Sequence, residues 1–115
     1  MPLPPQSDVA NRLLKLLTAS TKPVETDQAY QILADWFGLS QFDRSAMMDG
    51  EKREIAWHVR VRWAKNDLDK AGWADSEADG LWVPTVAGRR VQQARDKIAA
   101  QGGRLEEEDL WGDDT

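Results

Sequence analysis

The most constraining feature of this sequence is a stretch from Glu51 to Ala71 that contains no glycine or proline and stops at Gly72. At about 100° per residue on a helix, four of its apolar residues fall within one narrow sector and predict the side that faces the core. These four residues are Trp57, Val61, Ala64 and Leu68. The length of the stretch and its apolar stripe predict one long helix against which the rest of a small domain packs.

Two other rows of residues run along this helix. A second apolar row lies on nearly the opposite side and consists of Ile55, Val59 and Trp63. This row needs cover, either inside the domain or from another chain, so a homodimer is one expectation. Between the two rows lies the polar strip, which we define as His58, Arg62, Lys65, Asn66 and Asp69. The polar strip is the surface that the helix offers to a partner.

The residues before the long helix predict an extended lead and two or three shorter helices. Residues 1–6, MPLPPQ, contain three prolines and indicate an extended chain. Ser7 offers an N-cap for a first helix, and Thr26 starts a second helix that Gly38 closes. Ser40 can cap a short helix or turn after it. The apolar positions expected to face the core are Val9, Leu13, Leu16, Leu17, Ala29, Ile32, Leu33, Trp36 and Phe37.

The residues after Gly72 predict a hairpin and a last helix. The sequence WADSEADGLWV indicates two strands around a polar turn that ends at Gly80, and a proline ends the second strand. Thr85 offers the N-cap of the last helix, whose first turn Gly88 weakens. This order predicts a mostly helical α+β fold of winged helix-turn-helix type, with four to five helices and one two-stranded β-hairpin wing.

The charge of the chain is distributed unevenly. Residues 102–115 hold six acidic residues against Arg104, so they account for the whole formal net charge of -5. Residues 1–101 are balanced, with 14 basic and 14 acidic residues. A neutral body can still show a basic face, because clustering matters more than the sum. We expect residues 1–101 to form the winged-helix domain and residues 102–115 to form an acidic, flexible tail.

The composition argues against several classes of site. The chain has no cysteine and His58 is its single histidine, so we expect neither a metal site nor a cofactor. No stretch approaches the roughly 18 apolar residues of a membrane span, which predicts a cytoplasmic protein that does not enter a membrane. No serine lies in a nucleophile elbow, and no Asp or Glu has a lysine two places on, as many metal-dependent nucleases require. We therefore expect no enzyme.

Two residues of the polar strip have the chemistry that reads DNA bases. Arg62 can pair with a guanine edge and Asn66, one turn later, with an adenine edge. Basic residues nearby can contact phosphates. The candidate contacts to double-stranded DNA are therefore Arg62, Lys65, Asn66, His58, Arg60, Arg53, Lys52, Arg44, Arg89 and Arg90. The alternative is a solvated helix face, on which Arg62 and Asn66 contact each other and Lys65 pairs with Asp69.

The hairpin argues against a simple DNA contact. Asp75, Glu77 and Asp79 place negative charge where a wing approaches the duplex, and phosphate repels them. Either the wing is displaced or the partner is not DNA.

The six tryptophans are expected mainly in the core. Four of them lie on apolar rows: Trp36, Trp57, Trp63 and Trp82. A stacking platform for a base at Trp73 and Trp82 is the functional alternative.

A longer motif runs from Trp63 to Gly88, in which WA...L.kAG is followed by G.W..T..G. With the residues before it, this motif makes residues 3–92 resemble the N-terminal domain of the Mrr family of restriction endonucleases. The resemblance implies a winged helix that binds DNA and brings a separate nuclease domain to modified targets. A nuclease domain does not fit into 115 residues, so cleavage is not carried over. The acidic DSEAD of the hairpin also departs from the family pattern.

Two functions stay open at this point. The first is a non-catalytic module that binds double-stranded DNA, linked to restriction and defence or to transcription control. The second is a protein-interaction module that uses its acidic wing and tail against a basic protein partner.

Overall fold

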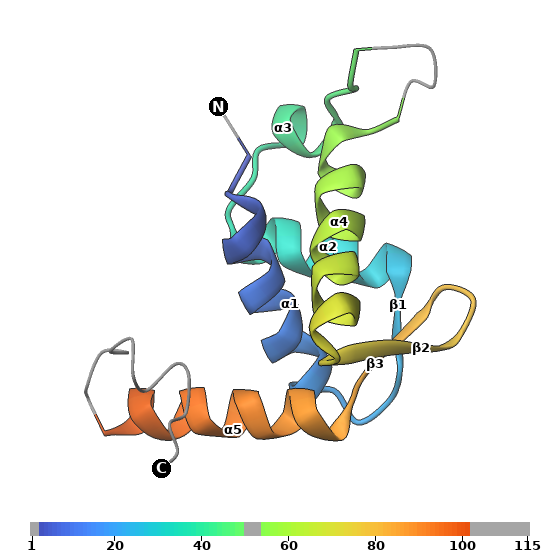
Figure 1. Cartoon of the computed structure of the whole chain (residues 1–115). Coiled ribbons are helices and arrows are strands. Elements are labelled where there is room, and N and C mark those ends of the chain that lie inside the picture. The colour runs from blue at the N-terminus through green and yellow to red at the C-terminus, as the bar shows by residue number, and fades with distance from the viewer. Residues whose placement is uncertain (1–2, 50–53, 102–115) are drawn as a thin grey trace.

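The computed structural model describes residues 3–49 and 54–101 (Figure 1). Within these residues the chain forms five helices and three short strands. In chain order they are α1 (Gln6–Ala19), β1 (Val24–Glu25), α2 (Thr26–Trp36), α3 (Gln41–Ser45), α4 (Ala56–Ala71), β2 (Ala74–Ala78), β3 (Leu81–Pro84) and α5 (Val86–Ala100). The expectation of a mostly helical α+β fold is confirmed. None of the described helices is long and apolar enough to span a membrane.

The long helix α4 lies side by side with α1, and the core fills the space between them and α2 (Figure 1). All four residues of the expected stripe on α4 are buried, and Trp57 and Val61 are almost fully enclosed. The indole N–H of Trp57 donates a 2.9 Å hydrogen bond to the backbone carbonyl of Tyr30 on α2. A large ring is thereby buried without leaving its one polar group unpaired.

The sheet contains one strand more than the sequence predicts. Its order is β1-β3-β2, with both pairs antiparallel, and Val24 of β1 lies opposite Trp82 of β3. A strand of two residues shows no alternation of polar and apolar side chains, so the pattern could not reveal it. The predicted two-stranded hairpin is present as β2 and β3 (Figure 1), and β1 adds a third strand to its sheet. The arrangement is consistent with a winged-helix-like fold.

Three of the predicted helix starts are confirmed and two are wrong, and α2 begins at Thr26 as predicted. The hydroxyls of Ser40 and Thr85 accept hydrogen bonds from backbone N–H groups three residues later, which caps α3 and α5. Helix α1 begins at Gln6 without a side-chain cap, so Ser7 does not cap it. Helix α4 begins at Ala56 instead of Glu51, because the residue before it, Ile55, forms an isolated bridge with Met47.

Several apolar residues expected in the core are exposed. Trp36 and Trp63 keep 57% and 54% of their surface accessible, and Ile32 keeps 45%. Helix α2 turns Tyr30 and Ala34 inward instead, and no described element covers the side of α4 that carries Trp63. Apolar spacing shows which residues share a face, but a neighbour must be present for that face to be buried.

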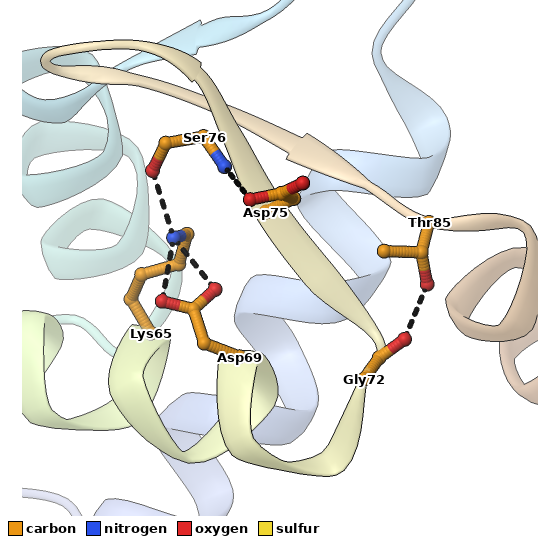
Figure 2. A network of polar contacts seen from close by, with 6 residues as sticks. All are labelled: Lys65, Asp69, Gly72, Asp75, Ser76 and Thr85. Carbon is orange, nitrogen blue, oxygen red and sulfur yellow. Dashed lines mark hydrogen bonds and ion pairs between the residues drawn. The ribbon is translucent and has the colours of Figure 1, made fainter.

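The start of α5 is fixed against the end of α4 by a close backbone approach at Gly88. Thr85 donates a hydrogen bond from its N–H to the carbonyl of Trp73. Its hydroxyl donates to the carbonyl of Gly72 (Figure 2). This brings the same Trp73 carbonyl oxygen within 2.0 Å of the position that a Cβ atom on Gly88 would take. Gly88 is therefore required by space, although it weakens the helix itself.

We expect Gly88→Ala to destabilise the domain by about 2 kcal/mol, because a backbone carbonyl cannot move aside as a flexible side chain can. The sign is diagnostic, since the same change inside an ordinary helix stabilises by about 1 kcal/mol. The free energy of unfolding from urea titrations measures it, with Gln93→Ala on an exposed position of α5 as the control. A Gly88→Ala domain more stable than the wild type would contradict the close approach.

Candidate nucleic-acid interface

Contacts on both sides of α4 determine which of its residues remain accessible. On one side Arg60 donates to the carbonyl of Pro4, and Asp67 accepts a 2.6 Å hydrogen bond from Gln6. On the other side the helix meets α2 and β2. The residues between these two sides form the outer face of α4, which we define as Val59, Arg62, Trp63, Asn66 and Lys70. Arg62, Trp63 and Lys70 are exposed there, and Val59 and Asn66 are half-buried.

The polar strip is therefore not one open surface, and Lys65 shows this most clearly. Its side chain is buried, with 5% of the residue accessible. Figure 2 shows its ammonium group between Asp69 and Ser76: it donates to the two carboxylate oxygens at 2.8 and 3.0 Å and to the hydroxyl at 3.2 Å. It also lies 5.4 Å from the ring centre of Trp82. The expectation that Lys65 is presented to a groove is wrong, because the wing strand covers it.

His58 is also taken up by the fold. Its ring stacks on Tyr30, with the ring centres 3.9 Å apart and nearly parallel. Burial is the main cause that lowers the pKa of His58 below 6.5, and the nearby positive charge of Arg62 lowers it further. His58 is therefore mostly neutral at pH 7 and adds no positive charge to the polar strip.

Arg62 keeps its exposure but has an acidic neighbour. Its guanidinium forms a 2.5 Å ion pair with Glu54, and the side chains of both residues are almost half accessible. The hydrogen bond that Arg62 donates to Glu54 is the main cause that raises the pKa of Arg62. An ion pair this exposed stabilises by at most about 1 kcal/mol, so a phosphate or a base edge can replace the carboxylate at small cost.

The candidate phosphate contacts divide into three groups. Arg44 and Arg60 hold the fold together, since Arg44 donates to the carbonyl of Leu39 and to Asp35, and Arg60 donates to Pro4. Arg89 and Arg90 are exposed in the first turns of α5. Lys52 and Arg53 lie outside the described residues. The expectation that Arg44 is free to contact phosphate is wrong, because its guanidinium is occupied by the carboxylate of Asp35 and the carbonyl of Leu39.

One cation on the outer face of α4 is missed by the sequence reasoning. Lys70 is exposed and lies one turn beyond Asn66 and two turns beyond Arg62. Lys70 follows Asn66 by four residues, as Asn66 follows Arg62, and this spacing places all three on one face of a helix. Its position in the last turn, next to the left-handed Gly72 that ends α4, also suits a positive charge.

The hairpin carries the negative charge that the sequence predicts. Asp75, Glu77 and Asp79 are all exposed, and Asp75 accepts a hydrogen bond from the N–H of Ser76. Trp82 is buried in the core as expected, so its ring cannot serve as the alternative stacking platform for a base. The hairpin therefore offers neither a base-stacking surface at Trp82 nor a positive charge at its tip.

The comparison with protein families settles the family. A model of the Mrr N-terminal domain matches residues 8–94, from the first helix through most of α5. The chain belongs to the Mrr N-terminal domain family. This membership confirms the resemblance drawn from the sequence motif and supports a restriction-related role for the domain. The comparisons with curated proteins and with solved structures gave no match.

The ion pair between the buried Lys65 and the exposed Asp69 predicts an order of stabilities for this Mrr N-terminal domain. Asp69→Ala leaves the ammonium of Lys65 buried beside a hydroxyl alone and should cost about 1–3 kcal/mol. Lys65→Met removes the charge together with the need for a partner and should cost less than about 1.5 kcal/mol. Urea titrations of both variants measure the difference. If Lys65→Met proves the more damaging change, the predicted order is wrong, and the contacts of Lys65 with Ser76 and Trp82 outweigh the cost of an unpaired ammonium.

The stacked histidine predicts a pH dependence. The folded state holds the pKa of His58 below 6.5, so the unfolded chain binds the proton more readily, and stability falls as the pH falls through 6.5. His58→Phe keeps a ring on Tyr30 but cannot titrate. Unfolding free energies measured between about pH 7.5 and about pH 5.5 should fall more for the wild type than for His58→Phe. Equal slopes for the two proteins would contradict the burial of a neutral imidazole.

Proposed function

We propose that this Mrr N-terminal domain binds double-stranded DNA without cleaving it, through the outer face of α4. The observation that carries the proposal is that Arg62, Asn66 and Lys70 follow one another at single-turn intervals on the one side of α4 that no described element covers. Membership of a restriction-related family supports it, since such a domain serves to bring an activity to a target.

The chemistry of the outer face suits a major groove. Arg62 and Asn66 lie about 6 Å apart along the helix axis, which lets them meet neighbouring base pairs. Lys70, one turn further on, is placed for a phosphate at the groove edge. The exposed ring of Trp63 offers apolar contact of the kind that a thymine methyl group makes with side chains.

The acidic hairpin limits how the domain can approach the duplex. Because Asp75, Glu77 and Asp79 repel phosphate, the hairpin tip stays away from the sugar-phosphate backbone of the bound DNA. Arg89 and Arg90 follow the hairpin directly and are the remaining candidates for phosphate contact on that side. This arrangement leaves recognition mainly to α4.

The second candidate is a protein-interaction module, and exposed aromatic side chains favour it. Trp63 is 54% accessible and Phe42 on α3 is 76% accessible. Large exposed aromatic rings are enriched at protein interfaces. The partner can be a basic protein that meets the acidic hairpin, or a second copy of the chain that covers Trp63, so the homodimer stays a prediction.

DNA binding is tested with Arg62→Ala combined with Lys70→Ala. We expect the double variant to bind a fluorescent duplex at least tenfold more weakly than the wild type. The slope of log affinity against log salt should fall by about one unit for each lost phosphate contact. Thermal stability should change little, because both side chains are exposed.

The matched control is Lys22→Ala combined with Lys97→Ala, which removes the same charge from exposed positions outside α4. Retained affinity in the control with lost affinity in the test variant supports the outer face as the binding surface. Equal affinity of the two double variants would reject it. No duplex binding by the wild type at low salt would favour the protein-interaction module.

A further inference from the structure

A groove of about 380 Å³ lies between α1, the end of α2 and α5, away from the outer face of α4. Its walls carry Arg12 and Lys15 from α1, Trp36 and Phe37 from α2 and the turn after it, and Gln92 and Arg95 from α5. Only one acidic residue, Asp8, lines the groove with them. The lining is therefore aromatic and positively charged.

The three cations of the groove have no carboxylate partner among the described residues. The guanidinium of Arg12 stacks on the ring of Trp36, 3.4 Å from its centre, which leaves its N–H groups free to bond in the plane. Arg95 donates to the side-chain oxygen of Asn11 at 3.2 Å and lies over the ring of Trp73. Burial removes water from the guanidinium of Arg95 and thereby lowers its pKa. No carboxylate among the described residues pairs with this charge. The groove therefore carries positive charge that can pair with an anionic group.

Gln92 adds a second requirement. The residue is buried and its Nε2 donates a 2.8 Å hydrogen bond to Asp96, but its Oε1 accepts none from any described residue. A buried acceptor without a donor costs about 1–3 kcal/mol. An occupant that carries N–H donors as well as negative charge therefore suits this lining best. A peptide has both, whereas the sugar-phosphate backbone of DNA has no N–H group.

We propose that the groove binds the acidic segment of the same chain, residues 104–114. This segment contains six acidic residues together with Leu105, Leu110 and Trp111, so it matches the cations, the aromatic wall and the need for N–H donors. Residues 102–115 carry a net charge of -5, which is opposite in sign to the three cations that line the groove.

The segment is long enough to reach the groove. It follows α5, whose last residue, Ala100, lies only about 8 Å along the helix axis from Arg95. Fourteen extended residues span up to about 46 Å, so residues 102–115 can turn back along α5 to α1. Attachment to the same chain raises the local concentration of the segment to the millimolar range, so a weak contact suffices to hold it.

A spin label tests this contact in the full chain. Because the sequence has no cysteine, Thr115→Cys provides a single position for a nitroxide. In a ¹⁵N-labelled sample at about 0.05 M salt, the amide signals of Asn11, Lys15 and Gln92 should lose intensity compared with the reduced label. The loss should disappear at about 1 M salt, where charges are screened within about 3 Å.

Charge reversal separates the groove from general attraction. Lys15→Glu changes an exposed side chain of the groove and should restore the signals, whereas Lys22→Glu, an equal change on an exposed residue outside this groove, should leave the loss intact. Trp36→Ala, also on an exposed side chain, should restore them as well. The dispersion of the other amide signals shows that each variant is folded.

The remaining outcomes overturn the proposal. Loss of signal spread over the whole surface, or no loss at all, would mean that the segment does not occupy the groove. A mixed sample tests for binding between chains: one chain carries ¹⁵N and no nitroxide, and the other carries the nitroxide and no ¹⁵N. Loss of signal in this sample would mean that the segment binds a second copy. The DNA titrations of Arg62 and Lys70 do not depend on this result, because the groove includes no residue of α4.

Discussion

The packing of α4 against α1 and α2 is the interaction on which the rest of the structure depends. Trp57 is almost fully buried, and its N–H donates to the carbonyl of Tyr30, so the ring can take this place only with α4 in one rotation about its axis. That rotation sets the direction of every other residue of the helix. It turns Lys65 toward the hairpin and leaves Arg62 toward solvent. The composition of the candidate interface is therefore a consequence of core packing.

The fold also divides the positive charge of the domain. Three cations bond to partners within the domain. Arg44 and Arg60 donate to backbone carbonyls, and Lys65 donates to a carboxylate. Among the exposed cations that remain are Arg62 and Lys70 on the outer face of α4 and Lys15 in the groove between α1 and α5. Residues 1–101 carry no net charge, yet the outer face of α4 and the groove both favour anions. The hairpin has the opposite local charge, because its exposed residues are acidic.

Much of the fold could be predicted from spacing, because helices impose a period of 3.6 residues on the residues they bury. The stripe on α4 and the caps at Ser40 and Thr85 follow from such local rules. The candidate site was harder to predict. Whether Lys65 is accessible depends on Ser76, which lies 11 residues away on another element, and the exposure of Trp63 depends on the absence of any described element across from it.

The sequence by itself determined the helical order, the core side of the long helix, the hairpin and the family of the domain, because each of these follows from residues close together in the chain or from a fixed motif. Only the tertiary structure decided which cations are free. An ammonium or guanidinium group bonds to whatever acceptor the fold brings within reach. The i,i+4 spacing indicates the pair of Lys65 with Asp69, but the hydroxyl of Ser76 and the carbonyl that Arg60 bonds come from other elements. The spacing along one helix holds no information about such partners.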